Sequence, residues 1–148
     1  MTDLQKAGLI GDPLFEVNFL NSSLWHGRTW TYRTTFDAAK LSAVAGSTDV
    51  LLVLDGVKMG ARVFLNNQLL GTVSDQFLRY SFSAKSALKP AGQTNRLAVE
   101  FDESIAVDGR YMACSGGWDW APYTTAKDSQ GLAMFTKGIW KDIYLVRV

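Results

Sequence analysis

The chain has 148 residues, a length that suits one domain able to bury roughly 68–70% of its unfolded surface. Its 47% hydrophobic and 20% charged residues are typical of a folded globular protein. The formal net charge of +1 leaves no basic excess to neutralise phosphates, which excludes nucleic acid as the main partner. Cys114 is the single cysteine, which excludes an internal disulfide and a cysteine metal cluster.

No stretch of the sequence approaches the length that spans a membrane, so no membrane partner is expected. The N-terminus lacks the basic start and the apolar run of a signal peptide. The compartment stays open: cytoplasmic by default, or exported if a signal has been removed.

The first 29 residues predict irregular structure, because two glycines and Pro13 interrupt any long element. Residues 3–7 are compatible with one short helical turn. The single histidine, His26, has no second ligand or base partner in the sequence. A surface or structural role is therefore favoured for it over catalysis or metal binding.

Residues 30–36 predict the first clear strand, because large and polar side chains alternate with a period of two. One face carries the side chains expected to be buried, namely Trp30, Tyr32, Thr34 and Phe36. The following stretch, residues 37–45, is rich in Ala and Leu. It fits either a short helix capped by Asp37 or a loop.

The middle of the chain predicts a strand followed by a hairpin. Residues 50–54 form a continuous apolar run that is too short for a confident helix and fits a buried strand. Residues 61–65 and 68–73 flank Asn66 and Asn67. Because asparagine tolerates positive φ, this pair predicts a two-residue hairpin turn.

Residues 78–82 and 96–101 predict two more strands, since apolar and polar side chains alternate in both. Between them, residues 84–89 give a helical turn at most, because Pro90 stops it. Residues 92–95 read as a turn.

The alternation then stops until a final strand predicted over residues 139–148. Seven or so short strands without long helical crossovers predict an all-β, antiparallel β-sandwich. No linker, repeat or low-complexity tract divides residues 1–148, so a single domain is expected. Periodicity does not give the order of the strands.

The stretch 115–123, Ser-Gly-Gly-Trp-Asp-Trp-Ala-Pro-Tyr, is the most distinctive in the chain. Its two adjacent glycines permit a sharp turn, and Pro122 favours extended backbone before it. In an extended segment, Trp118 and Trp120 point to one side and Asp119 to the other.

Two roles fit these side chains. The indoles of Trp118 and Trp120 could plug one end of the core. Alternatively, their flat faces suit the C–H faces of a sugar ring, while the Asp119 carboxylate accepts hydrogen bonds from its hydroxyls. Arg110 lies shortly upstream and could clamp Asp119 or bond a sugar hydroxyl. An ordinary surface ion pair made by Arg110 would look the same in the sequence.

Residues 117–122, Gly-Trp-Asp-Trp-Ala-Pro, resemble the Gly-Trp-Asp-Trp-Gly-Pro motif of β-mannosidases in glycoside hydrolase family 2. Ala121 replaces the second glycine of that motif, and Tyr111 stands where the family often has a lysine after the arginine. Residues 30–36 are similar to the Trp-x-Tyr-x-x-x-Phe pattern of the family's first strand. The hairpin region, residues 54–71, is similar as well.

The resemblance runs from about Asp3 to Val148 and implies a jelly roll with galactose-binding-like topology. It also implies a substrate-binding role for the motif residues and the nearby arginine, namely Trp118, Asp119, Trp120 and Arg110. In the family, this loop reaches into the active-site pocket of a separate barrel domain. A mannoside or a related hexose is the implied ligand, and the barrel is the implied partner.

Catalytic residues are not predicted in this chain. A glycosidase normally needs two carboxyl groups across the scissile bond, and nothing in the sequence makes a pair converge among Asp102, Glu103, Asp108 and Asp119. In the resembling enzymes both catalytic glutamates come from a (β/α)₈ barrel, which alone takes about 250 residues. No cofactor is expected, because the glycine-rich stretch lacks the lysine of a phosphate loop. The spacing of the acidic residues does not predict a metal site.

Three functions are compatible with this sequence. The leading hypothesis is the non-catalytic sugar-binding domain of a β-mannosidase-like family 2 enzyme. The alternatives are a free-standing, lectin-like carbohydrate-binding protein and a structural β-sandwich that docks another protein. Continuation of the reading frame beyond Val148 would separate the first hypothesis from the second.

Overall fold

The computed structural model describes residues 2–12, 15–16, 18, 29–39, 49–58, 60–102, 104–105 and 137–148. These residues form one short helix, α1 (Thr2–Lys6), and nine strand segments. The strands are β1 (Trp30–Asp37), β2 (Val50–Leu54), β3 (Val57–Lys58), β4 (Ala61–Leu65), β5 (Gln68–Val73), β6 (Tyr80–Ser83), β7 (Thr94–Phe101), β8 (Gly138–Ile139) and β9 (Ile143–Arg147). The predicted all-β class is confirmed.

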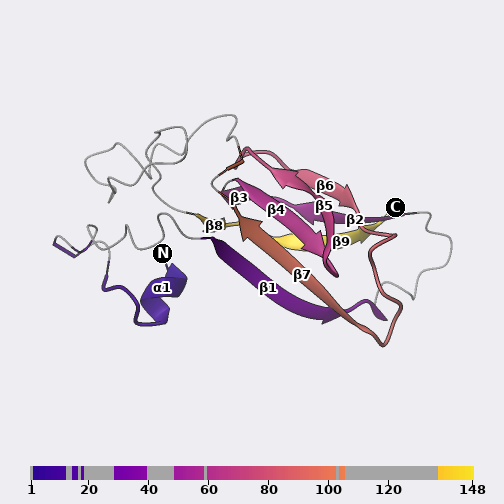
Figure 1. The fold of residues 1–148 in the computed structure, drawn as a ribbon, viewed down its shortest axis with the longest axis horizontal. Coiled ribbons are helices and arrows are strands. Elements are labelled where there is room, and N and C mark those ends of the chain that lie inside the picture. Colours follow the sequence, from indigo (N-terminus) through magenta and orange to yellow (C-terminus); the bar gives the residue numbers. More distant parts are fainter. Residues whose placement is uncertain are drawn as a thin grey trace.

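The strands form two main sheets and one short ribbon (Figure 1). The larger sheet has the order β1-β7-β4-β5, the smaller has the order β6-β2-β9, and β3 pairs with β8. Every pairing between these strands is antiparallel. The neighbours β4 and β7 are about thirty residues apart in sequence, a long connection of the kind found in jelly rolls.

One hydrophobic cluster lies between the two main sheets. Leu52 and Leu54 of β2 belong to the same buried cluster as Val63 and Leu65 of β4. All four side chains are at most 1% exposed. Because burying each such side chain stabilises the fold by about 1.5–3 kcal/mol, these contacts hold the sheets together as a sandwich.

The predicted first strand and its face are largely confirmed. Trp30, Tyr32 and Phe36 pack against the buried cluster, whereas Thr34 is exposed. The Asp37 side chain accepts a hydrogen bond from Ala39 N at 2.9 Å, as expected of a cap. Residues 40–48 lie outside the described residues, so the choice between helix and loop stays a prediction.

The predicted hairpin is confirmed, with Asn66 and Asn67 at φ of 50° and 68°. Positive φ at both positions is the signature of a type I′ turn, whose twist matches that of the flanking strands. Asn66 also donates to the Ala87 carbonyl oxygen at 2.8 Å and to Asn95 Oδ1 at 2.7 Å. The turn is therefore fixed to β7 and to the segment before it, as well as to its own strands.

The strand predicted over residues 78–82 begins later than expected, at Tyr80. A turn precedes it, in which Phe77 N donates to Asp75 Oδ1 at 2.8 Å and Asp75 N donates to the Tyr80 hydroxyl at 2.9 Å. Leu78 is consequently 55% exposed instead of facing the core. The alternating pattern was misleading here because a side-chain-bonded turn competes with strand pairing.

The prediction of one strand over residues 139–148 is wrong. The segment divides into β8 and β9, with a corner at residues 140–142. Trp140 N and Lys141 N both donate to the Gly56 carbonyl oxygen, at 3.0 and 3.4 Å. These bonds to a distant residue turn the chain from the β3–β8 ribbon to the smaller sheet.

Candidate functional site

The predicted sugar-binding residues Trp118, Asp119, Trp120 and Arg110 lie outside the described residues. The structure does describe the two places where the chain leaves for this segment and returns from it. These places and the side chains around them, all at one end of the sandwich, are called the loop base below. Its members are Asp3, Tyr32, Lys58, Gly60, Arg62, Asp102, Ser104 and Gly138.

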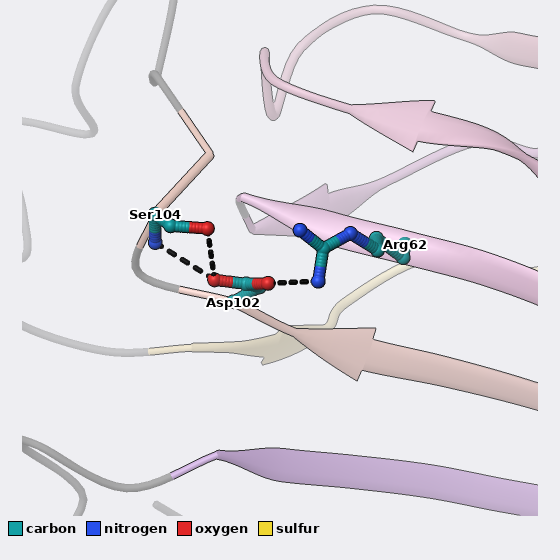
Figure 2. A network of polar contacts seen from close by, with 3 residues as sticks. All are labelled: Arg62, Asp102 and Ser104. Carbon is teal, nitrogen blue, oxygen red and sulfur yellow. Dashed lines mark hydrogen bonds and ion pairs between the residues drawn. The ribbon is translucent and has the colours of Figure 1, made fainter.

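The chain leaves the sandwich at Asp102, directly after β7. Its backbone N donates to the Gly60 carbonyl oxygen at 2.8 Å. The Asp102 carboxylate accepts hydrogen bonds from the Ser104 backbone N at 2.8 Å and hydroxyl at 2.6 Å, and it pairs with the Arg62 guanidinium (Figure 2). The end of β7 is therefore fixed to β4 through both its backbone and its side chain.

Two hydrogen bonds from Ser104 hold the pKa of Asp102 below its usual value near 3.8, and the bond from the Ser104 hydroxyl has the larger effect. The Arg62 charge lowers this pKa further. Hydrogen bonds to the charged form of a carboxylate favour that form. Asp102 is thus a charged structural acceptor at neutral pH, with both of its oxygens occupied, and it is unsuited to donate a proton as a general acid.

The chain returns to the sandwich at β8. Gly138 pairs with Lys58, and Ile139 pairs with Val57. Since Lys58 and Gly60 are two residues apart, both ends of the intervening segment are fixed to nearly the same point. The described chain therefore leaves the sandwich at Asp102 and returns to it at Gly138 on either side of the β3–β4 connection.

The N-terminal helix is linked to the same end of the sandwich (Figure 1). The Tyr32 hydroxyl donates to Asp3 Oδ2 at 3.0 Å. A Cβ atom built on Gly138 would lie 3.4 Å from that hydroxyl, so Tyr32 also borders the start of β8. Burial, followed by the hydrogen bond to Asp3, raises the pKa of Tyr32 to about 12, and the phenol stays protonated at neutral pH.

Two residues at this end were missed by sequence reasoning. Trp140 is 43% exposed, contacts the backbone at Gly56 and has Lys141 Nζ 4.4 Å from its ring centroid. Lys58 is only 7% exposed although it carries a charge. No motif marks either residue: Trp140 lies inside the strand predicted over residues 139–148, and Lys58 lies between two predicted strands.

The described ranges contain neither a metal-binding cluster nor a membrane-spanning helix. No group of three or more His, Cys, Asp or Glu side chains that could hold a metal ion occurs among them. In the same ranges, no helix has both the length and the apolar character to cross a membrane.

These features define a class: an antiparallel β-sandwich whose chain leaves at Asp102 and returns at Gly138 at the same end of the molecule. Residues 1–109 match the family described as "Glycosyl hydrolase 2 galactose-binding domain-like". This match covers more than half of the chain, and the chain belongs to that family. The resemblance noted in the sequence is confirmed at this level.

Characterised relatives are similar over nearly the whole chain. "Beta-mannosidase B" of Emericella nidulans is 28% identical over 166 aligned positions, which cover 97% of this chain and 18% of that protein. "Beta-mannosidase" of Rattus norvegicus is 27% identical, covering 95% of this chain and 18% of that protein. The chain thus spans about a fifth of the length of these relatives.

Solved structures agree with this assignment. The β-D-mannosidase of Dictyoglomus thermophilum superposes with a TM-score of 0.75 at 27% identity, covering 98% of this chain and 19% of that one. An exo-chitosanase of Amycolatopsis orientalis gives a TM-score of 0.62 at 20% identity and covers 99% of this chain, which shows a shared fold.

Proposed function

We propose that residues 1–148 are a single, non-catalytic carbohydrate-binding domain of a β-mannosidase-like glycoside hydrolase. In this proposal, the segment between Asp102 and Gly138 carries Trp118, Asp119 and Trp120 into the sugar pocket of a separate catalytic barrel. Arg110 assists by bonding Asp119 or a sugar hydroxyl. The substrate is a mannoside or a related hexose.

The observation that carries this proposal is the similarity to β-mannosidases over 95–97% of the chain, against 18% of their own length. In this proposal, a different segment of the enzyme forms the catalytic barrel, because that fold takes about 250 residues. The domain's contribution is therefore to recognise sugar and to brace the barrel.

The loop base supports the proposed site in physical terms. A loop that presents binding groups loses less entropy on binding when its ends are already fixed. Here one end is held by the Asp102 bonds and the other by the β3–β8 ribbon. Indole faces supply apolar contact with a sugar ring, and a carboxylate such as Asp119 supplies charge-assisted acceptors.

Weak binding is expected from the isolated chain. One or two aromatic contacts of about 0.5–1.5 kcal/mol each and one charge-assisted hydrogen bond of about 1.5–3 kcal/mol must offset the cost of immobilising the sugar. The surplus corresponds to a dissociation constant of about 1 mM or weaker.

Chemical-shift titration of the 148-residue chain with mannose, glucose and galactose tests the proposal. Saturable shifts at the Trp118 and Trp120 indoles, abolished by Asp119→Asn, are expected. Trp140→Phe is the matched control, because it removes another exposed indole and should leave the titration unchanged. If high-millimolar sugar shifts neither indole, or if Asp119→Asn leaves the shifts in place, autonomous sugar binding by this loop is wrong.

A further inference from the structure

A second candidate site lies on the outer face of the larger sheet, away from the core. A groove of about 830 Å³ crosses β1, β7 and β4 there. This volume falls within the roughly 300–1,000 Å³ of ligand sites in proteins. The side chains used in the argument below are Arg33, Thr35, Phe64, Asn67, Arg96 and Ala98.

The groove exists because a small residue stands between two large ones. Ala98 of β7 pairs with Arg33 of β1 on one side and with Phe64 of β4 on the other. Phe64 in turn pairs with Leu69 of β5, which is 51% exposed. Ala98, Phe64 and Leu69 therefore form an apolar row across three strands.

Positive charge flanks this apolar row. Arg96 is two residues from Ala98, the partner of Arg33, so the two arginines are diagonal neighbours about 7–8 Å apart at their backbones. Both are exposed, and neither is in an ion pair with another described residue. Among the described residues that line the groove, Glu100 is the one carboxylate. Arg62, which stands opposite Glu100 in the ladder, pairs with Asp102.

We propose that this groove binds an oligosaccharide that carries carboxylate groups. A sugar ring packs its C–H face on Phe64, while its carboxylates take bidentate hydrogen bonds from Arg33 and Arg96. Thr35 and Asn67 at the rim offer a hydroxyl and an amide to the sugar hydroxyls.

A sugar suits the groove better than a peptide that binds as an added strand. That mode of peptide binding needs an open sheet edge, where backbone groups are unpaired. The centre of this groove lies on β7 and β4, and each of these strands is paired on both sides. Recognition on this face must therefore come from side chains, which suits a ligand rich in hydroxyl and carboxylate groups.

Calorimetric titration of the 148-residue chain with tetragalacturonic acid tests the proposal, with mannotetraose as the neutral comparison. The acidic tetramer should bind at least about tenfold more tightly than the neutral one. Its binding should weaken as NaCl rises from about 50 to about 300 mM, because salt screens exposed charges. Arg33→Gln and Arg96→Gln should each weaken binding about tenfold, the size of one lost charge-assisted bond. Phe64→Leu should weaken it about threefold.

Arg79→Gln is the matched control, because it removes the same charge from a loop outside the groove, where Arg79 pairs with Asp55. It should change the affinity less than about twofold. Thermal unfolding of each variant confirms that the exposed substitutions leave the fold intact.

Four results would overturn the assignment. The first is that tetragalacturonic acid does not bind. The second is that Arg33→Gln, Arg96→Gln and Arg79→Gln weaken its binding equally, which would show a general electrostatic attraction. The third is that a poly-glutamate of equal charge binds as tightly, in which case the groove does not select sugars. The fourth is that Trp118→Ala abolishes binding, in which case the ligand occupies the loop of the proposed function. If mannose does not shift the Trp118 and Trp120 indoles, the proposed function fails but the groove proposal does not, so the two proposals are tested separately.

Discussion

The ring of Phe82 in β6 packs directly on the backbone of Gly71 in β5. A Cβ atom built on Gly71 would lie 2.3 Å from Phe82 Cε1 and 2.7 Å from Cδ1. The two residues belong to different sheets, so the missing side chain sets how closely β5 and β6 approach. Phe82 also stacks near Tyr80, with ring centroids 6.2 Å apart, which limits how far its ring can move.

Gly71→Ala should therefore destabilise the protein. Overpacking of this kind costs about 1–3 kcal/mol, because the aromatic ring or the sheet must shift. Urea unfolding measures the loss. Adding Phe82→Leu to Gly71→Ala should recover part of it, and strictly additive effects in this double-mutant cycle would contradict the proposed contact.

The hairpin asparagines should respond differently to the same substitution. Asn66→Gly keeps the positive φ but removes bonds to Ala87 O, Asn95 Oδ1 and Arg96 N, so a loss of about 1–3 kcal/mol is expected. Asn67→Gly removes no such bond and gives the Asn-Gly pair that type I′ turns prefer, so a change within about 0.5 kcal/mol is expected. Equal losses in thermal unfolding would show that the turn conformation, not the Asn66 network, dominates.

The Asp102 carboxyl should titrate below its usual pKa near 3.8. Because the pKa is lowered in the folded state, the stability it contributes is present above the unfolded-state value and is lost as pH falls through the folded one. Carbon-detected NMR titration measures the pKa of the Asp102 carboxyl directly. Ser104→Ala should raise the pKa more than Arg62→Gln does, since the Ser104 bond is the larger cause. The opposite order would make the ion pair dominant.

The Tyr32 phenol should ionise only near pH 12. Its pKa is raised above the ordinary value of 10.0, so the associated stability is fully present below pH 10 and is lost as pH rises from about 10 to about 12. Ultraviolet titration of wild type against Tyr32→Phe isolates this group. Asp3→Asn should lower the pKa only part of the way towards 10.0, because burial is the larger cause. A full return would assign the shift to Asp3 instead.

The 148-residue chain should not hydrolyse nitrophenyl glycosides, β-mannoside included. A retaining or inverting glycosidase needs two carboxyl groups flanking the scissile bond. Asp102 is occupied by Arg62 and Ser104. A continuous absorbance assay with purified chain provides the measurement. Hydrolysis abolished by one Asp or Glu substitution in this chain would contradict the prediction, whereas activity unaffected by all such substitutions indicates a contaminant.

Local sequence patterns determined much of the fold. Alternation of side chains identified β1 and β7, and the Asn66-Asn67 pair identified the two-residue hairpin between β4 and β5. These signals work because strand burial and positive φ depend on residues close together in the chain. The Gly-Trp-Asp-Trp motif also pointed to the family that the comparisons confirm.

Only the tertiary structure decided how these elements meet. The break between β8 and β9 depends on Gly56, more than eighty residues away, and the loop base depends on Asp102 reaching Gly60 and Arg62. The outer groove likewise requires Arg33, Phe64 and Ala98 from three strands. Periodicity records which face a side chain takes, but not which strand lies beside it. That choice is made by packing and hydrogen bonding between segments distant in sequence.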